Sequence, residues 1–169
     1  MTITLAEPYI GFQVALTEGN KEPVTADLVG RLNTVSGIGF TVNSIDTTSV
    51  SSITGYVEQT PLLKELKPIS VTVFYNKAGY DRIRGLATAN GIQGDDLLLS
   101  LTIFYPTLNA DRTNYRYVGF LKEFDESDAS VGDVQKFTFT FQPITKPVVT
   151  KADIEYDFTN DTASITTSP

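Results

Sequence analysis

Two strand patterns between Tyr115 and Ile144 limit the folds open to this chain more than any other stretch. The second pattern spaces three phenylalanines two residues apart, at Phe137, Phe139 and Phe141, with threonine between them. This spacing places one set of side chains on one face of a β-strand, and Phe and Thr both favour a pleated, half-buried surface. The stretch therefore predicts strands with one buried and one wet face, as antiparallel sheets usually have.

The residues that the chain lacks exclude several kinds of chemistry. It has no cysteine and no histidine, which excludes disulfides, thiolate nucleophiles, Ser-His-Asp triads and the common zinc sites. The formal net charge of -7 disfavours sustained binding to nucleic-acid phosphates or an anionic membrane, because that binding depends on Lys and Arg. The sequence shows neither a signal peptide nor a membrane-spanning window. We therefore expect synthesis in a cytoplasm and no membrane contact.

The remaining patterns predict short strands and one helix. Strands are expected at residues 9–16, 37–43, 69–75, 97–105, 115–124 and 134–142, while residues 24–34 are ambiguous between strand and helix. The helix is expected over residues 77–90, with Asn76 as its N-cap and an apolar face of Tyr80, Ile83, Leu86 and Ala87. The order predicts a mainly β chain with one helix (α+β): an antiparallel β-sandwich or half-barrel with a single flanking α-helix, a long inter-strand loop and extended terminal arms.

Three segments are expected to lie outside the core. Residues 44–54 are rich in small hydroxyl side chains and predict an extended loop, fixed only where something docks on it, which residues 61–68 close. Residues 1–8 and 148–169 predict an N-terminal and a C-terminal arm. The 169 residues fit a single domain, whose core would span residues 9–147.

Acidic residues cluster at the turn between the two opening strands. They are Glu123, Asp125, Glu126, Asp128 and Asp133. Their spacing does not follow an EF-hand loop, so a calcium site is a weaker interpretation than a plain solvated turn. A position facing a lumen or an interface is the third interpretation, in which the carboxylates would keep phosphate from binding.

Two further groupings admit a functional interpretation. Asp95 with Glu123 has the residue types of a glycoside hydrolase pair, but no pattern brings the two into one cleft. A sugar-stacking platform could use Tyr75, Tyr80, Tyr105, Tyr115 and Tyr117. Because tryptophan is absent, core and subunit-interface positions are the simpler interpretation of these tyrosines.

The order of features resembles the major tail tube protein of long-tailed (non-contractile) bacteriophages. The resemblance covers about residues 24–145. It rests on the glycine-containing strand at 37–43, the run from Ile45 to Ser52 that is similar to an I-D-x-T-x-x-x-S run of that family, the strand at 69–75, the helix at 77–90, the hairpin around 106–114 and the unit from Phe120 to Phe141.

The resemblance implies a structural virion protein with no catalytic, cofactor or metal site. Its subunits would form hexameric rings that stack into a tail tube through which DNA passes without specific binding. Its partners would be other copies of itself and tail proteins such as the tape measure and the tail terminator, in the virion tail. The loop over residues 45–66 would bridge the rings, with the candidate residues Ile45, Asp46, Thr47, Thr48, Ser49, Tyr56, Leu62 and Leu63.

Other functional classes remain open at this point. A tube protein of a contractile tail or secretion system would share the architecture and add a sheath partner. A carbohydrate-binding or adhesin-like β-sandwich would use the tyrosines instead. An enzyme is the least favoured class, because no pattern brings catalytic residues together.

Overall fold

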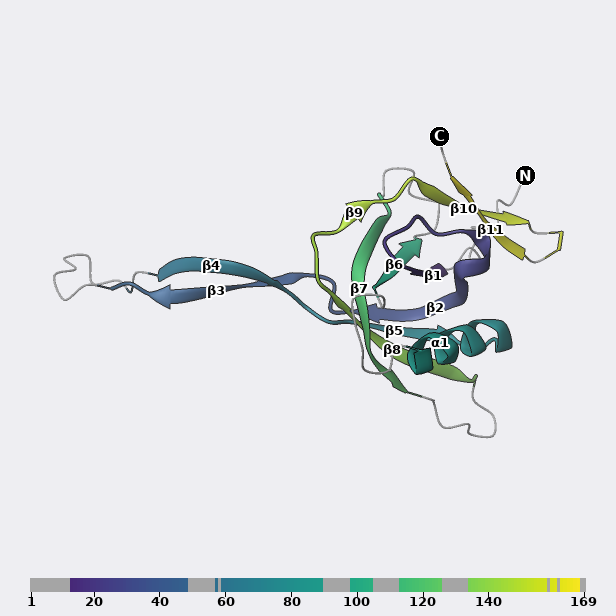
Figure 1. Ribbon diagram of the computed structural model, residues 1–169, viewed down its shortest axis with the longest axis horizontal. Helices are drawn as coiled ribbons and strands as arrows, with labels where there is room; N and C mark the ends of the chain where they lie inside the picture. Colours follow the sequence, from purple (N-terminus) through teal and green to yellow (C-terminus); the bar gives the residue numbers. More distant parts are fainter. Residues whose placement is uncertain are drawn as a thin grey trace, which may run out of the picture.

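The computed structural model describes residues 13–48, 57, 59–89, 98–104, 113–125, 134–157, 159–160 and 162–167. The elements in Figure 1 are β1 (Gln13–Glu18), the 3-10 helix η1 (Thr25–Asp27), β2 (Leu28–Ser36), β3 (Phe40–Asp46), β4 (Gln59–Leu66), β5 (Ile69–Phe74), α1 (Lys77–Ala89), β6 (Leu99–Phe104), β7 (Tyr115–Asp125), β8 (Lys136–Pro143), β9 (Val148–Val149), β10 (Ala152–Asp157) and β11 (Thr162–Thr167). Each strand expected from the sequence has a counterpart. The ambiguous stretch at 24–34 divides into η1 and the start of β2.

A closed antiparallel barrel forms the body of the molecule. Its strands are hydrogen-bonded in the order β6-β1-β2-β5-β8-β7, and β6 pairs with β7 as well as with β1. β9 adds to β7 beside this barrel. The expected mainly β architecture with one helix is confirmed, and the sheet closes fully, which pairs the two edges that an open half-barrel would expose.

β8 supplies the centre of the core, as its phenylalanine pattern predicted. Phe137, Phe139 and Phe141 are 1%, 1% and 0% exposed. Their cross-strand partners on β5 are the β-branched residues Val73, Val71 and Ile69, all equally buried. Because burial of one such side chain contributes about 1.5–3 kcal/mol, this pair of strands is a principal source of the barrel's stability.

The helix α1 packs on the barrel through one face. The backbone N–H of Gly79 donates to Asn76 Oδ1 over 2.7 Å, so Asn76 is the N-cap that the sequence predicted. Ile83 and Leu86 lie in the core. Position 79 must be glycine, since a Cβ there would lie 1.8 Å from the carbonyl oxygen of Val29. No helix among the described residues is long and apolar enough to cross a membrane.

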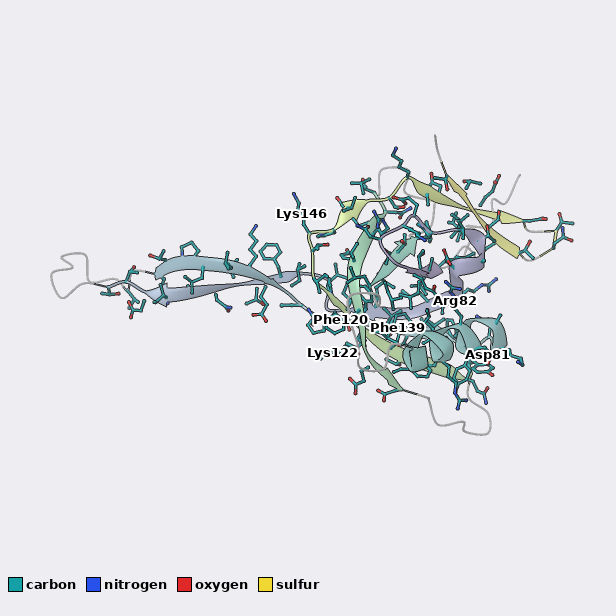
Figure 2. The ribbon with its side chains drawn as sticks, in the orientation of Figure 1. Asp81, Arg82, Phe120, Lys122, Phe139 and Lys146 are labelled. Atoms are coloured by element: carbon teal, nitrogen blue, oxygen red, sulfur yellow. The ribbon has the colours of Figure 1, made fainter. Side chains whose placement is uncertain are left out.

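A partly buried ion pair ties α1 to the barrel. The Arg82 guanidinium lies 2.6 Å from the Asp27 carboxylate and also donates to the Leu16 carbonyl oxygen over 2.8 Å (Figure 2). The Thr17 hydroxyl donates to the same carboxylate over 3.1 Å. One arginine therefore joins α1, β1 and η1, and Asp27 is buried with its charge compensated.

Two hairpins stand outside the barrel, and both correct the expectations from the sequence. Residues 44–54 were expected to be a loop closed by 61–68, but β3 runs through Asp46 and β4 occupies residues 59–66. Residues 49–56 and 58 lie outside the described part. Residues 148–169 were expected to be an arm outside the core, but β10 and β11 pair with each other, and Ile154 and Ile165 pack against a small buried cluster. In both places threonine and isoleucine favour a strand once a partner strand satisfies the backbone.

Candidate assembly surface: the β3–β4 hairpin

The β3–β4 hairpin projects from one side of the barrel as a two-stranded ribbon (Figure 1). Its register pairs Phe40 with Leu66 nearest the barrel and Asp46 with Gln59 toward the far end. All of β3 is exposed, and in β4 only Leu66 is half-buried. A two-stranded hairpin is marginally stable in water by itself. A surface that covered this ribbon would stabilise it further.

Large apolar side chains lie exposed along this ribbon. They are Phe40, Val42, Ile45, Val57, Leu62 and Leu63, with exposed fractions of 54%, 39%, 53%, 67%, 53% and 88%. The pairing register of the two strands shifts between Val42 and Ser44. Leu62 and Leu63 also line an open hollow with Asn43 and Pro61. Contiguous exposed apolar surface is typical of interaction sites, so the hairpin is a candidate assembly surface.

Polar contacts within the hairpin hold its two strands in register. The Ser44 hydroxyl donates to Gln59 Oε1 over 3.0 Å, and the Thr60 hydroxyl donates to Thr47 Oγ1 over 3.2 Å. Nearer the barrel, Lys64 Nζ lies 4.6 Å from the centre of the Phe40 ring, within cation–π range. These contacts define the ribbon's shape without covering its apolar side chains.

A charged group marks the far end of the described hairpin. The side chain and the backbone N–H of Thr48 hydrogen-bond to Asp46 and lower the pKa of its carboxyl group below the ordinary value. The carboxylate form is therefore favoured even in mildly acidic solution. The hairpin presents apolar side chains along its length and a negative charge toward its tip.

The hairpin root is fixed to the barrel by backbone geometry. Gly37 has a φ of +85°, and a Cβ at this position would lie 2.0 Å from the Pro68 carbonyl oxygen. Only glycine fits there without strain. The Gln142 side-chain amide at the end of β8 donates to the Leu66 carbonyl oxygen over 3.2 Å. The ribbon therefore leaves the barrel in a defined direction.

The structure brings most of the inter-ring candidates together. Ile45, Asp46, Thr47 and Thr48 lie on the β3 side of the hairpin, and Leu62 and Leu63 lie on β4. Ser49 and Tyr56 lie outside the described residues. The inter-ring role of all eight stays a prediction, but their grouping on one projecting element is a feature of the fold.

The acidic candidates occupy a different place. Glu123 and Asp125 are exposed near the end of β7 and pair in register with Thr140 and Thr138 of β8. Glu126, Asp128 and Asp133 lie outside the described residues, as does Asp95. The described residues contain no group of three carboxylates able to hold a metal ion. The lumen or interface role of the acids stays a prediction.

The described tyrosines do not share one surface. Tyr80 packs against the core beside Phe124 and Phe137, with ring centres 5.8 Å from each, and Tyr117 is buried. Tyr75 contacts Tyr80 at 5.4 Å. Tyr105 lies outside the described residues. These positions match the core interpretation of Tyr80 and Tyr117.

Sequence reasoning missed several exposed apolar residues. Phe40 and Val42 were assigned to a strand. They are exposed because β3 pairs with β4 alone and does not join the barrel, which the local pattern did not indicate. Phe120 and Ile144, near the hairpin root, are 42% and 49% exposed. The available signal was apolar alternation in a stretch whose neighbours are hydroxyl-rich, which suits a ribbon covered by a partner better than a core strand.

Comparisons place this fold among chains of assembled particles. No family model and no curated protein matches the chain. A chain in the tail of an empty GTA particle, refined with C6 symmetry, superposes with a TM-score of 0.55 at 13% identity, covering 81% of this chain and 95% of that one. A chain of the native gene transfer agent virion gives 0.56 at 14% identity, covering 86% and 99%. A chain from the sheath/tube terminator of the PVC extracellular contractile injection system gives 0.54 at 16%, covering 87% and 98%. At these identities the likeness establishes the fold alone.

Proposed function

We propose that this chain is a structural, non-enzymatic subunit of a tail tube, which assembles with copies of itself into rings that stack. The observation that carries the proposal is the β3–β4 hairpin, whose large apolar side chains stand exposed off a barrel that already has its own core. Such a ribbon serves assembly better than folding. Tail particles that contain chains of the same fold support this assignment.

The geometry supplies a physical mechanism for growth of a tube. The hairpin projects from one side of the barrel, and we propose that it docks on the barrel of a second copy and not on the same hairpin of that copy. Such contacts are heterologous, and they close into rings or continue as stacks according to the rotation between copies. The hairpin bridges one ring to the next, and Leu62 and Leu63 are the anchors that a neighbouring copy buries.

The finer assignment is a hexameric ring in a non-contractile tail, with the tube as a passage for DNA. The C6 symmetry of the similar GTA tail supports sixfold rings. The net charge of -7 suits a passage that does not retain DNA, with the acids from Glu123 to Asp133 as lumen or interface candidates. The proposed partners also include the tape measure and the tail terminator. Within this chain, a single domain over 1–169, the terminal arms at 1–8 and 148–169 complete the proposed contacts.

A tube subunit of a contractile system is the second candidate. The similar chain of a contractile injection system supports it. The two candidates differ in whether a sheath surrounds the tube. Recovery of particles from the natural source, with or without a second, more abundant outer protein around the tube, decides between them.

Replacement of the hairpin tests the assembly proposal. Phe40 and Leu66 are cross-strand partners, so residues 41–65 can be replaced by Asn-Gly, which forms a two-residue hairpin turn. The variant keeps every residue of the main core cluster, so we expect its melting temperature to stay near that of the wild type. Negative-stain microscopy should show tubes or rings for the wild type and single subunits or isolated rings for the variant.

A second variant separates the hairpin's length from its surface. Leu62→Ser with Leu63→Ser keeps the ribbon and removes its anchors, and it should lose stacking as the replacement does. A wild type that shows no ring or tube at any concentration tested, with or without nucleating tail material, contradicts the proposal.

A further inference from the structure

The β10–β11 hairpin has two unlike faces. Ile154 and Ile165 are cross-strand partners, and both pack against the small core cluster of Ala15, Phe104 and Ala152. Asp153, Glu155 and Asp157 occupy the alternate positions of β10 and are exposed. Residues 152–167 contain four acids and no Lys or Arg. One face of the hairpin therefore belongs to the barrel, and the other is a row of carboxylates in solvent.

This hairpin is held in place by the chain that leads into it. The Thr150 hydroxyl donates to the Glu22 carboxylate, and the Thr150 backbone N–H donates to the Asn114 carbonyl oxygen over 3.1 Å. Arg116 Nε lies 3.6 Å from the same glutamate. Thr150 and Arg116 are both buried. The carboxylate row is consequently presented in a fixed orientation, which lowers the entropic cost of docking.

A second surface lies at the root of the β3–β4 hairpin. We define the root patch as the exposed residues Lys67, Phe120, Lys122, Ile144 and Lys146. Phe120 is the cross-strand partner of Gln142, whose amide reaches the hairpin at Leu66. Figure 2 shows Phe120, Lys122 and Lys146 on the side of the barrel from which β3 and β4 extend. The patch is thus continuous with the base of the projecting hairpin.

The two surfaces carry opposite charge and lie on opposite sides of the barrel. The root patch has three lysines, and the acids beside it in the sequence are Glu65 and Glu123, of which Glu65 accepts a hydrogen bond from Asn43 over 3.4 Å. Figure 1 places β10 and β11 across the barrel from β3 and β4. The acidic hairpin of one chain therefore cannot reach its own root patch, but it can reach that of another copy.

We propose that the carboxylate face of β10–β11 docks on the root patch of a second copy of this chain. The inference rests on the proposed self-assembly and names the two surfaces that meet. Asp153, Glu155 and Asp157 lie against Lys122, Lys146 and Lys67, and Phe120 and Ile144 lose water at the centre of the contact. Because the surfaces differ, the contact is heterologous and sets the direction in which copies are added. Exposed charges of this kind steer and select partners more than they hold them.

Charge exchange tests the contact. The double variants Asp153→Lys with Glu155→Lys, and Lys122→Glu with Lys146→Glu, each place like charges across the interface, while all four positions are exposed and the core is intact. We expect each double variant to need at least about tenfold more protein to assemble. In equal mixtures of the two variants both contacts between unlike copies are matched in charge, so alternating copies should recover assembly, as should the fourfold variant. The control reverses an exposed pair on α1, Lys77→Asp with Asp81→Lys, and should assemble like the wild type.

Site-specific cross-linking tests directly whether the two surfaces meet, because the natural chain has no cysteine that would compete. Glu155→Cys protein mixed with Lys146→Cys protein should cross-link as a dimer with a short bismaleimide, and Glu155→Cys mixed with Asp81→Cys should not. Raising salt from about 0.05 M to about 1 M shortens the Debye length roughly 4.5-fold, and should reduce the cross-linked fraction. This inference is overturned if the wild type assembles and the double variants assemble equally well, or if it assembles and the 155–146 cross-link is absent. Either result leaves the proposed function intact. A wild type that forms neither rings nor tubes overturns the proposed function, and the cross-link then reports on pairing of copies alone.

Discussion

The substitution Leu63→Ser tests whether the hairpin's apolar side chains act in assembly and not in folding. Leu63 is 88% exposed and belongs to neither hydrophobic cluster, so the free energy of unfolding should change by less than about 0.5 kcal/mol. Burial of a leucine side chain against a second copy contributes about 1.5–3 kcal/mol, which corresponds to roughly a tenfold to 150-fold change in dissociation constant. On the proposed function, every stacked subunit would make this contact. The concentration at which polymer first appears should therefore rise by about that factor.

Two assays and one control separate a role of Leu63 in assembly from a role in folding. Light scattering over a concentration series gives the onset of assembly, and thermal unfolding followed by circular dichroism gives stability. Leu101→Ala is the control, because Leu101 is 0% exposed and its truncation should cost about 2–5 kcal/mol of stability. Leu63→Ser should behave in the opposite way, with stability kept and the onset of assembly moved to higher concentration. An unchanged onset of assembly, or a loss of stability comparable to that of Leu101→Ala, would refute the reasoning.

Three further predictions follow from the barrel, the root and the C-terminal hairpin. Phe139→Ala should cost about 3–5 kcal/mol of stability, measured by chemical denaturation. Phe120 lies on the adjacent strand and is 42% exposed, so Phe120→Ala should leave stability unchanged. Equal losses would contradict the assignment of the buried face of β7 or β8. Gly37→Ala should destabilise the hairpin root, because the added Cβ would meet a backbone carbonyl oxygen at 2.0 Å. Faster amide hydrogen exchange at residues 38–42 would report this loss. Unchanged exchange would show that the root accommodates the Cβ without strain. The Asn160 side chain, followed by the backbone N–H of Thr159, lowers the pKa of Asp157. The turn therefore gains stability from this carboxylate above its ordinary pKa and loses that stability as pH falls through the folded-state pKa. Asn160→Ala should raise the pKa of Asp157 toward its ordinary value in an NMR titration, and no change would exclude the Asn160 hydrogen bond as the cause.

The sequence was most informative where local patterns and the core agreed. The phenylalanines of β8 follow strict alternation and are buried, and Asn76 caps α1 at the position that its side chain favours. Closure of the barrel was not predictable from such patterns, because it depends on β6 pairing with both β1 and β7. The β6–β7 pairing is local and follows from the hairpin expected around 106–114, but the β1–β6 pairing joins segments that are far apart in the chain.

The hairpin outside the barrel shows why the site was harder to predict than the fold. Pro61 argues against a strand, since proline cannot donate to a ladder. In a two-stranded ribbon each strand has one unpaired edge, so β4 accommodates proline where a central strand would not. Hydroxyl residues at Ser44 and Thr47 suggested a loop, yet both bond across the ribbon. On the proposed function, a covering partner and not the chain's own core would give these residues their role.

Electron microscopy of the wild type beside the variant with residues 41–65 replaced by Asn-Gly tests the central claim most directly. Both proteins should first be shown to melt alike, which establishes that the barrel is intact in each. The account predicts hollow tubes or stacked rings from the wild type and none from the variant. Tubes of normal length from the variant would contradict the role of the β3–β4 hairpin in assembly.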